Sequence, residues 1–234
     1  MVKMESYIFL VSILCLLVVK VHCRCYKLEE SQNQYLTYES SGIDFTESSN
    51  FQLSFKTTKA NSLLYYSESE YRDDDAPLDY EGLYIYEGIL HYFIFNPTIY
   101  GGGFSRGAHV KTDKEVNNGT WITVEFFRNK EGLVPGAFSD SNPITMNQTG
   151  IIINGDKFAF DGTIDKMDVA DQKLYVGGHS ELAVRIDKQG KLGGFDGYID
   201  MFKDLKSNTE LDPMEPGKLF ESKECDRNSP LPLA

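Results

Sequence analysis

Apolar and polar residues alternate with a period of two in most apolar stretches of the chain. The clearest example is FQLSFK at residues 51–56, and LLYYS at 63–67 follows it after a short polar corner. A period of two places alternate side chains on opposite faces of a strand, whereas a helix needs a period near 3.6. These stretches therefore predict β-strands with a buried face, and we expect these two to pair with one another.

Turn-forming residues divide the rest of the chain into short strands. Glu87-Gly88 separates strands expected at 82–86 and 89–95, and predicts a hairpin because glycine accepts the positive φ of a tight turn. The second of these strands, ILHYFIF, has aromatic side chains on both faces, so it is covered on both sides or contributes to a binding surface. Further strands are expected at 35–38, 121–128, 132–138, 144–146, 151–153, 158–160, 174–176 and 197–202, and 108–112 is expected to be extended.

Segments without this alternation are predicted as loops. Residues 25–34 form a polar lead-in, 68–81 a solvated acidic loop and 96–107 a glycine-rich flexible stretch. The only helical candidate is a turn or two near 216–222. Many short strands with turns between them predict an all-β domain in which two antiparallel sheets stack as a sandwich. A chain of 234 residues can build one such domain.

The N-terminus predicts secretion. The apolar run YIFLVSILCLLVV at 7–19 follows Lys3 and ends before Lys20. A membrane-spanning helix needs roughly 20 apolar residues, so this shorter run predicts a cleaved signal peptide over residues 1–23. We therefore expect a secreted, extracellular protein without membrane insertion after cleavage. Its domain covers 24–225, and a polar tail covers 226–234.

Cysteine and asparagine positions agree with an oxidising compartment. Cleavage after Cys23 leaves two cysteines, Cys25 and Cys225, and an even pair suggests a disulfide. Cleavage one residue earlier would keep Cys23 and leave the pairing ambiguous. The triplets NGT and NQT predict N-glycosylation at Asn118 and Asn147.

The charge of the chain argues against polyanionic partners. The formal net charge is -12, and the lysine and arginine residues are scattered rather than clustered. Long-range repulsion therefore disfavours nucleic acid, heparin-like sulfated glycans and anionic membrane surfaces.

Candidate catalytic and zinc-binding patterns are incomplete. Ser105 stands in a G-x-S-x-G pentapeptide, but the nucleophile elbow needs a strand before it and a helix after it. His91, His109 and His179 are isolated, without a second histidine or cysteine at zinc-ligand spacing. We expect Trp121 and the aromatic strand residues to lie in the core.

Three segments occur in an order that is typical of one protein family. They are FQLSFKTTKANSLLYYS at 51–67, VNNGTWITVEFFR at 116–128, and LYVGG followed by GFDGYI within 174–202. In this order they resemble the opening strand pair, the tryptophan-containing strand and the closing signature of laminin G-like domains. The resemblance implies an antiparallel two-sheet jelly-roll sandwich of the concanavalin A-like class.

Two departures from the family pattern concern the predicted disulfide and the family's calcium site. The family often has a cysteine after its Gly-Phe-x-Gly turn, but Tyr198 stands here, so the resemblance leaves Cys225 to pair with Cys25. Many members hold calcium through acidic residues of two rim loops. Asp168 and Asp171 are candidates in the second loop, but the first, 97–107, contains no acid. We therefore expect neither a family-type calcium site nor another cofactor.

The resemblance implies a non-catalytic binding module that recognises an extracellular protein or a glycan. We expect the rim loops 97–107, 165–171 and 179–191 to contact this partner. One alternative is a glycoside hydrolase on the same sandwich; its nearest strand carboxylates, Asp196 and Asp200, lack a glutamate in register, and turn and surface positions explain both. Another is a matrix component that self-associates through sheet edges.

Overall fold

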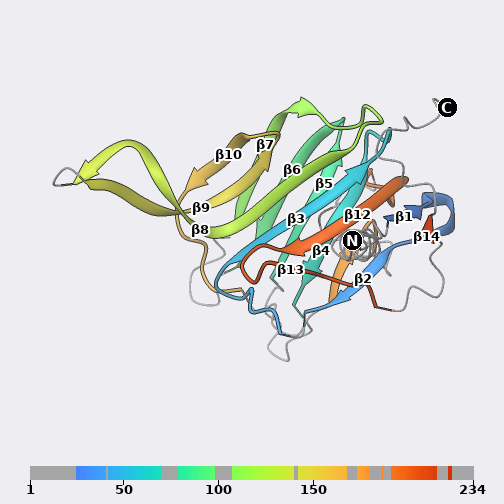
Figure 1. Ribbon diagram of the computed structural model, residues 1–234, viewed down its shortest axis with the longest axis horizontal. Helices are drawn as coiled ribbons and strands as arrows, with labels where there is room; N and C mark the ends of the chain where they lie inside the picture. Colours follow the sequence, from blue (N-terminus) through green and yellow to red (C-terminus); the bar gives the residue numbers. More distant parts are fainter. Residues whose placement is uncertain are drawn as a thin grey trace, which may run out of the picture.

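Two β-sheets stack face to face (Figure 1). This computed structural model describes residues 25–40, 42–69, 79–97, 107–139, 142–167, 173–179, 186, 191–214 and 221–222. The eight-stranded sheet contains, in spatial order, β10 (Asp156–Asp161), β9 (Asn142–Ile153), β8 (Ile122–Ser139), β3 (Ser49–Lys56), β12 (Gly197–Asp204), β1 (Cys25–Leu28) and β14 (Glu221–Ser222), and β13 (Thr209–Glu210) pairs with β12. The six-stranded sheet contains β2 (Leu36–Glu39), β11 (Lys173–Val176), β4 (Ser62–Glu68), β5 (Tyr80–Tyr86), β6 (Ile89–Phe95) and β7 (Ala108–Glu115).

The predicted all-β sandwich of two antiparallel sheets is confirmed. The predicted hairpin is present as β5 and β6, in which Tyr86 pairs with Ile89. Glu87 and Gly88 both have positive φ, 52° and 80°, and this conformation matches the right-handed twist of the flanking strands. The described chain contains a single helical element, the 3-10 turn η1 (Glu30–Gln32).

The predicted pairing of 51–56 with 63–67 is wrong. β3 pairs with β8 and β12 in one sheet, whereas β4 pairs with β5 and β11 in the other. The Phe51 and Tyr65 rings consequently face one another across the core, with centroids 5.8 Å apart. Alternation predicts that each strand buries one face. Two such strands can bury that face either side by side in one sheet or opposite each other in two stacked sheets, so alternation does not distinguish the two arrangements.

Aromatic rings from both sheets fill the core. Phe126 of β8 lies 4.9 Å from Tyr65 and 5.5 Å from Tyr92 between ring centroids, so β8 packs directly on the opposite sheet. Phe51 also contacts Phe202 of β12 at 5.4 Å. Such ring pairs add to the free energy gained by burying apolar area. Trp121, predicted in the core, is instead half-buried outside the main cluster and lies near Tyr198.

Two segments predicted as polar contribute to the sandwich. The lead-in 25–34 contains β1, whose Tyr26 and Leu28 are buried against the core. The acidic segment 68–81 ends in β5, where Glu81 is fully buried. Polar sequence therefore did not imply solvent exposure in either segment, because the neighbouring strands cover these residues.

The strands predicted at 121–128 and 132–138 form one long strand, β8. Together with β9 it forms an arm, residues 129–139 and 142–147, that projects from the body of the sandwich at the left of Figure 1. β3 pairs with β8 only up to Arg128, and β10 pairs with β9 only from Gln148. Within the described chain, the two strands of the arm pair only with one another.

Candidate functional site

Aromatic side chains cross the outer face of the six-stranded sheet. In β6, Leu90, Tyr92 and Ile94 point into the core, and the side chains between them lie half-buried on the outer face. Ring contacts with centroids 4.3 to 6.2 Å apart connect an aromatic row formed by His109, Phe93, Tyr80, Tyr66, His179, Tyr175 and Tyr35. The strand ILHYFIF thus has one core face and one face that is available for a binding surface.

Other side chains cover the middle of the aromatic row, and a separate candidate site lies at each of its two ends. Tyr66 and Tyr80 are 1% and 4% exposed. Ile186, from the predicted rim loop 179–191, packs against this cluster, and a Cβ on Gly82 would lie only 2.2 Å from its Cδ1. Glycine at this position therefore lets the Ile186 side chain lie against the strand. Two sites remain at the ends of the row.

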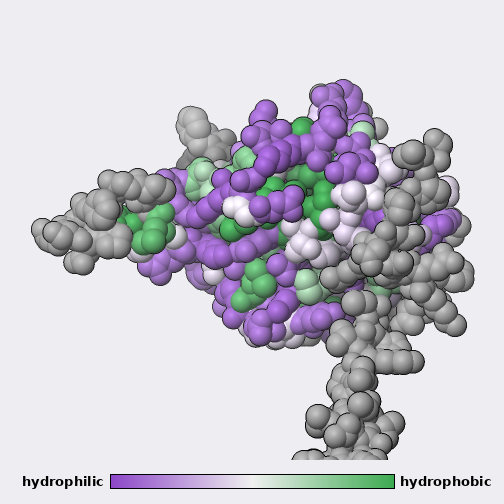
Figure 2. All heavy atoms as spheres, turned by 45° about the horizontal axis from the view of Figure 1, so that its top comes forward, coloured by the Kyte–Doolittle hydropathy of each residue, from purple (hydrophilic) through white to green (hydrophobic). Residues whose placement is uncertain are grey.

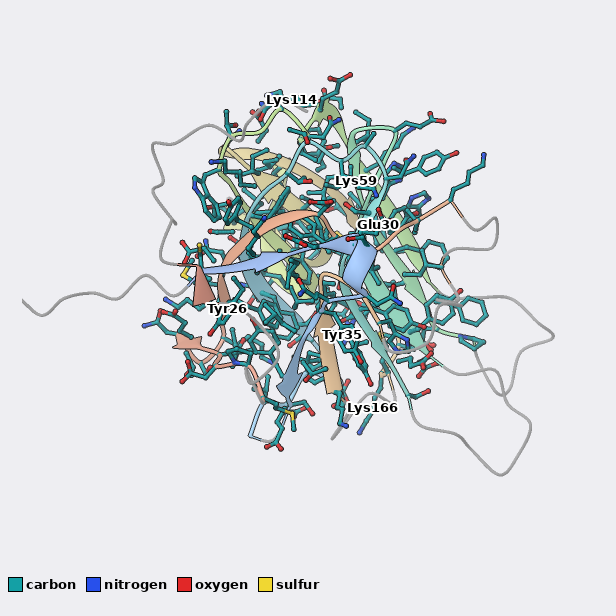
Figure 3. The ribbon with its side chains drawn as sticks, turned by 90° about the vertical axis from the view of Figure 1, so that its right-hand side faces the viewer. Tyr26, Glu30, Tyr35, Lys59, Lys114 and Lys166 are labelled. Atoms are coloured by element: carbon teal, nitrogen blue, oxygen red, sulfur yellow. The ribbon has the colours of Figure 1, made fainter. Side chains whose placement is uncertain are left out.

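A hollow of about 140 Å³ lies at the Tyr35 end. Its lining comes from the turn after β1 and from both sides of the 179–191 segment: Glu30, Asn33, Gln34, Tyr35, Leu63, Gly178, His179, Leu192, Gly193 and Gly194. Figure 3 shows Glu30 and Tyr35 on this side of the molecule. The hollow therefore combines one aromatic wall with carboxylate, amide and imidazole groups.

Local contacts hold the polar groups of the hollow in place. Glu30 forms an ion pair with Lys59, its neighbour in Figure 3. The Gln34 Oε1 atom accepts a hydrogen bond of 2.9 Å from the backbone N–H of Glu29. The Glu30 carboxylate lies directly against Gly193, where a Cβ would displace it from this position. A partner would therefore meet a largely preformed site.

A pair of histidines occupies the opposite end of the row. His91 Nδ1 and His109 Nε2 lie 2.9 Å apart on neighbouring strands, so the expectation that these histidines are isolated is wrong. Burial, followed by the charges of His109 and Lys111, lowers the pKa of His91 to about 4. Burial and Lys111 also lower the pKa of His109. Both rings are therefore neutral at pH 7.

Comparison with known proteins decides the family. A family model described as "Laminin G domain" matches residues 55–203. The chain belongs to the laminin G domain family. The resemblance inferred from its motifs is confirmed, although residues 30–35 of the hollow precede the matched segment.

Relatives and solved structures agree with this assignment. The laminin subunit alpha of Drosophila melanogaster is 24% identical over 214 residues, which cover 86% of this chain and 5% of that protein. Domains LG4-5 of the mouse laminin alpha1 chain superpose with a TM-score of 0.59 at 19% identity, covering 81% of this chain and 44% of that one. The LG1-3 region of the laminin alpha2 chain gives 0.53 at 16% identity, covering 81% and 33%. The chain thus spans 5% of the Drosophila subunit and less than half of either solved structure.

The rim loops predicted for this laminin G domain lie only partly within the described residues. The Asn96 side chain donates hydrogen bonds to the carbonyls of Asp165 and Lys166, at 2.7 and 3.4 Å, so the bases of the first two loops meet. His179 begins the third loop, beside the hollow. Asp168, Asp171 and Ser105 fall outside the described residues. Within the described chain, no group of three or more His, Cys, Asp or Glu side chains could hold a metal ion.

The remaining predicted residues lie apart from the aromatic row. Cys25 is disulfide-bonded; Cys225 lies outside the described residues, so the pairing of these two stays a prediction. Asn118 is exposed and Asn147 half-buried. Asp196 is exposed as expected, but Asp200 is buried within β12 at 8% exposure, which corrects its predicted surface position.

Sequence reasoning missed the hollow because three of its lining residues, Glu30, Asn33 and Gln34, lie in the supposed polar lead-in. The alternation of Tyr26 and Leu28 with Lys27 was the available signal for β1. No local pattern could place η1 beside Gly193, since this contact depends on the whole sandwich.

Across the described residues we also find no helix of the length and apolarity needed to span a membrane.

Proposed function

We propose that this laminin G domain is a secreted, extracellular binding module that recognises a protein or glycan partner and catalyses no reaction. The observation that carries the proposal is the preformed hollow beside the ends of the 179–191 segment. The predicted signal peptide over 1–23 and the two predicted glycosylation sites support secretion. The similarity to a laminin alpha subunit supports an extracellular location.

The chemistry of the hollow supports recognition of one sugar ring or one side chain of a larger partner. Ligand pockets typically combine an apolar or aromatic wall with a few fixed polar groups, and those for drug-sized ligands measure about 300–1,000 Å³. This hollow is smaller, at about 140 Å³. Tyr35 provides the ring face, and Gln34 and Glu30 provide held polar groups.

A direct test uses the secreted chain on a glycan array and on a panel of extracellular matrix proteins. Once a ligand is found, Tyr35→Ala should weaken binding at least tenfold, because the aromatic wall is removed. Tyr198→Ala is the matched control: it removes a half-buried tyrosine of the other sheet, and should change the affinity less than twofold. Equal effects of the two variants would place the partner elsewhere.

The hydrolase alternative has a separate test. Of the two candidate carboxylates, Asp200 is buried in β12 and Asp196, which directly precedes this strand, is exposed. We expect no turnover on a panel of β-glucans. Turnover that Asp196→Asn abolishes would contradict the proposal of a non-catalytic module.

Self-association is a second candidate function, favoured by the arm. The described chain exposes three large hydrophobic side chains, Leu133 at 60%, Met146 at 44% and Phe160 at 36%. The first two belong to the arm and the third to the adjacent β10. Figure 2 shows apolar atoms in green on the surface of the arm. Unpaired strand edges can add a strand from another chain. Sedimentation of the wild type and of the Leu133→Lys variant tests self-association. A wild-type protein that sediments as a strict monomer would exclude it.

A further inference from the structure

Asn147, the second predicted glycosylation site, lies on the same face of the sheet as Phe160. β10 lies beside β9 at the base of the arm (Figure 1). Its Phe160 pairs with Thr149, the third residue of the glycosylation triplet NQT. Directly paired residues of an antiparallel sheet share a face, and so do residues two apart along one strand. Asn147 and Phe160 are therefore diagonal neighbours on one face.

The Phe160 ring lies over Gly162, the cross-strand neighbour of Asn147. The Gly162 N–H donates a hydrogen bond of 2.9 Å to the Asn147 carbonyl, so these two residues lie side by side. A Cβ added to Gly162 would stand 3.1 Å from the Phe160 ring atom Cε2, so the ring rests against this glycine. Because residue 162 is a glycine, its position places no side chain between the ring and Asn147.

The Asn147 side chain points toward the β10 side of the arm base. Its Nδ2 atom donates a hydrogen bond of 3.2 Å to Oγ1 of Thr163, in the loop after β10. Thr163 is exposed and Phe160 is 36% exposed, so solvent reaches both. Asn129 holds this loop, because its side chain donates to the Ile164 carbonyl and accepts from the Ile164 N–H, each at 2.7 Å. The nitrogen that would carry a glycan and an exposed aromatic ring thus meet beside a fixed loop.

We propose that the first N-acetylglucosamine of a glycan on Asn147 packs against the Phe160 ring. In the secretory pathway Asn147 Nδ2 displaces the pyrophosphate of a lipid-linked oligosaccharide, bonds to C1 of this sugar and releases one proton. The substituted Nδ2 keeps its second hydrogen for the bond to Thr163. The proposal rests on the proposed secretion of the chain and is independent of the hollow.

The sugar and the ring are chemically complementary. An aromatic ring has a negative face, and the C–H groups on one face of a pyranose carry small positive partial charges that this face attracts. Packing also removes apolar area of Phe160 from water, which is favourable. The glycan would therefore cover one of the three large hydrophobic side chains that the described chain exposes.

Nuclear magnetic resonance of the secreted chain with isotope-labelled glycans tests the contact directly. The aromatic ring current should shift proton signals of the sugar on Asn147 upfield, and nuclear Overhauser effects should connect these protons to the Phe160 ring. Phe160→Leu should abolish the upfield shifts. Met146→Leu is the matched control, because the exposed Met146 directly precedes Asn147 in β9 and lies on the opposite face. It should leave the shifts unchanged.

Urea denaturation of the glycosylated protein gives a second readout. Asn147→Gln removes the glycan but keeps an amide, and it should lower the urea midpoint. In a Phe160→Ser background the same change should leave the midpoint unchanged, because the sugar has no ring to cover. Comparing the two backgrounds cancels the direct effect of Phe160 on folding. Equal midpoint losses in both backgrounds, or wild-type sugar signals at the positions of a free glycan, would overturn the proposal.

Peptide mass spectrometry of the unaltered secreted chain distinguishes failure of this proposal from failure of the proposed secretion. We expect a glycan on a measurable fraction of Asn147. Occupancy of Asn118 with none at Asn147 would overturn the sugar–ring contact alone. Empty sites at both positions would contradict secretion as well. Ligand binding at the hollow, tested by Tyr35→Ala, does not depend on either result.

Discussion

Arg128 and Glu81 form a fully buried ion pair that connects the two sheets. Arg128 Nε of β8 lies 3.2 Å from Glu81 Oε2 of β5, and both side chains are 0% exposed. The tyrosines 65 and 92 donate hydrogen bonds of 2.9 Å to the two carboxylate oxygens. Arg128 also donates to the carbonyls of Thr46, at 2.9 Å, and Phe45. These contacts satisfy both charges inside an apolar core.

Breaking this pair should strongly destabilise the fold. Arg128→Met leaves the Glu81 carboxylate buried without its cation, which should lower the free energy of unfolding by about 3–5 kcal/mol. Urea denaturation monitored by circular dichroism measures the change. Lys114→Met is the control, because it breaks the exposed ion pair with Asp156, and we expect no measurable shift of its midpoint. Similar midpoints for the two variants would contradict the structural role of the buried pair.

Stability should fall as the pH decreases from about 6.5 to 4. The folded-state pKa of His91 is about 4, below the value of about 6.5 in an unfolded chain. The unfolded state therefore binds more protons in this window, and acid favours it. After allowance for solvent screening we expect a loss of about 1–2 kcal/mol. Urea unfolding at pH 7 and pH 4.5 measures it.

His91→Gln provides the comparison for this pH dependence. Between pH 7 and pH 4.5 the variant should lose less free energy of unfolding than wild type, because the titrating ring is absent. The neighbouring groups that face His91 are His109 and Lys111 of β7 and Tyr84 and Tyr86 of β5. A variant with the same slope as wild type would show that another group is responsible.

Asn118 should carry a glycan more completely than Asn147. Asn118 is exposed, and its Oδ1 accepts hydrogen bonds from the backbone N–H and the hydroxyl of Thr120, at 3.0 and 2.6 Å. Asn147 is half-buried, and its Nδ2 donates to Thr163 Oγ1 at 3.2 Å. Enzymatic deglycosylation in heavy-oxygen water followed by peptide mass spectrometry reports both occupancies. Higher occupancy at Asn147 would contradict this prediction.

Cys225 should be the disulfide partner of Cys25. Cys25 is disulfide-bonded, and Ser222 of β14 lies opposite it in the register. A non-reducing peptide map should contain the Cys25–Cys225 pair, and neither thiol should react with alkylating agents before reduction. Cys225→Ser should lower the free energy of unfolding by about 2–5 kcal/mol. A peptide that links Cys25 to Cys23 instead would refute the assignment.

The sequence by itself determined the class of fold. Alternation with a period of two is a local property, so it located strands such as those of the β5–β6 hairpin, although it missed β1. Ordered motifs along the chain also sufficed for the laminin G family. These features depend on residues close together in the sequence, and turn chemistry such as Glu87-Gly88 reports directly on the backbone.

Only the tertiary structure decided which distant residues meet. β3 and β4 both satisfy the alternation rule, but their separation into opposite sheets depends on the strands that compete to pair with them. Glu81 stands in an acidic stretch and is buried because Arg128, 47 residues away, reaches it across the core. His91 and His109 are 18 residues apart and meet through the register of β6 with β7. Long-range packing sets such contacts, and no local pattern encodes them.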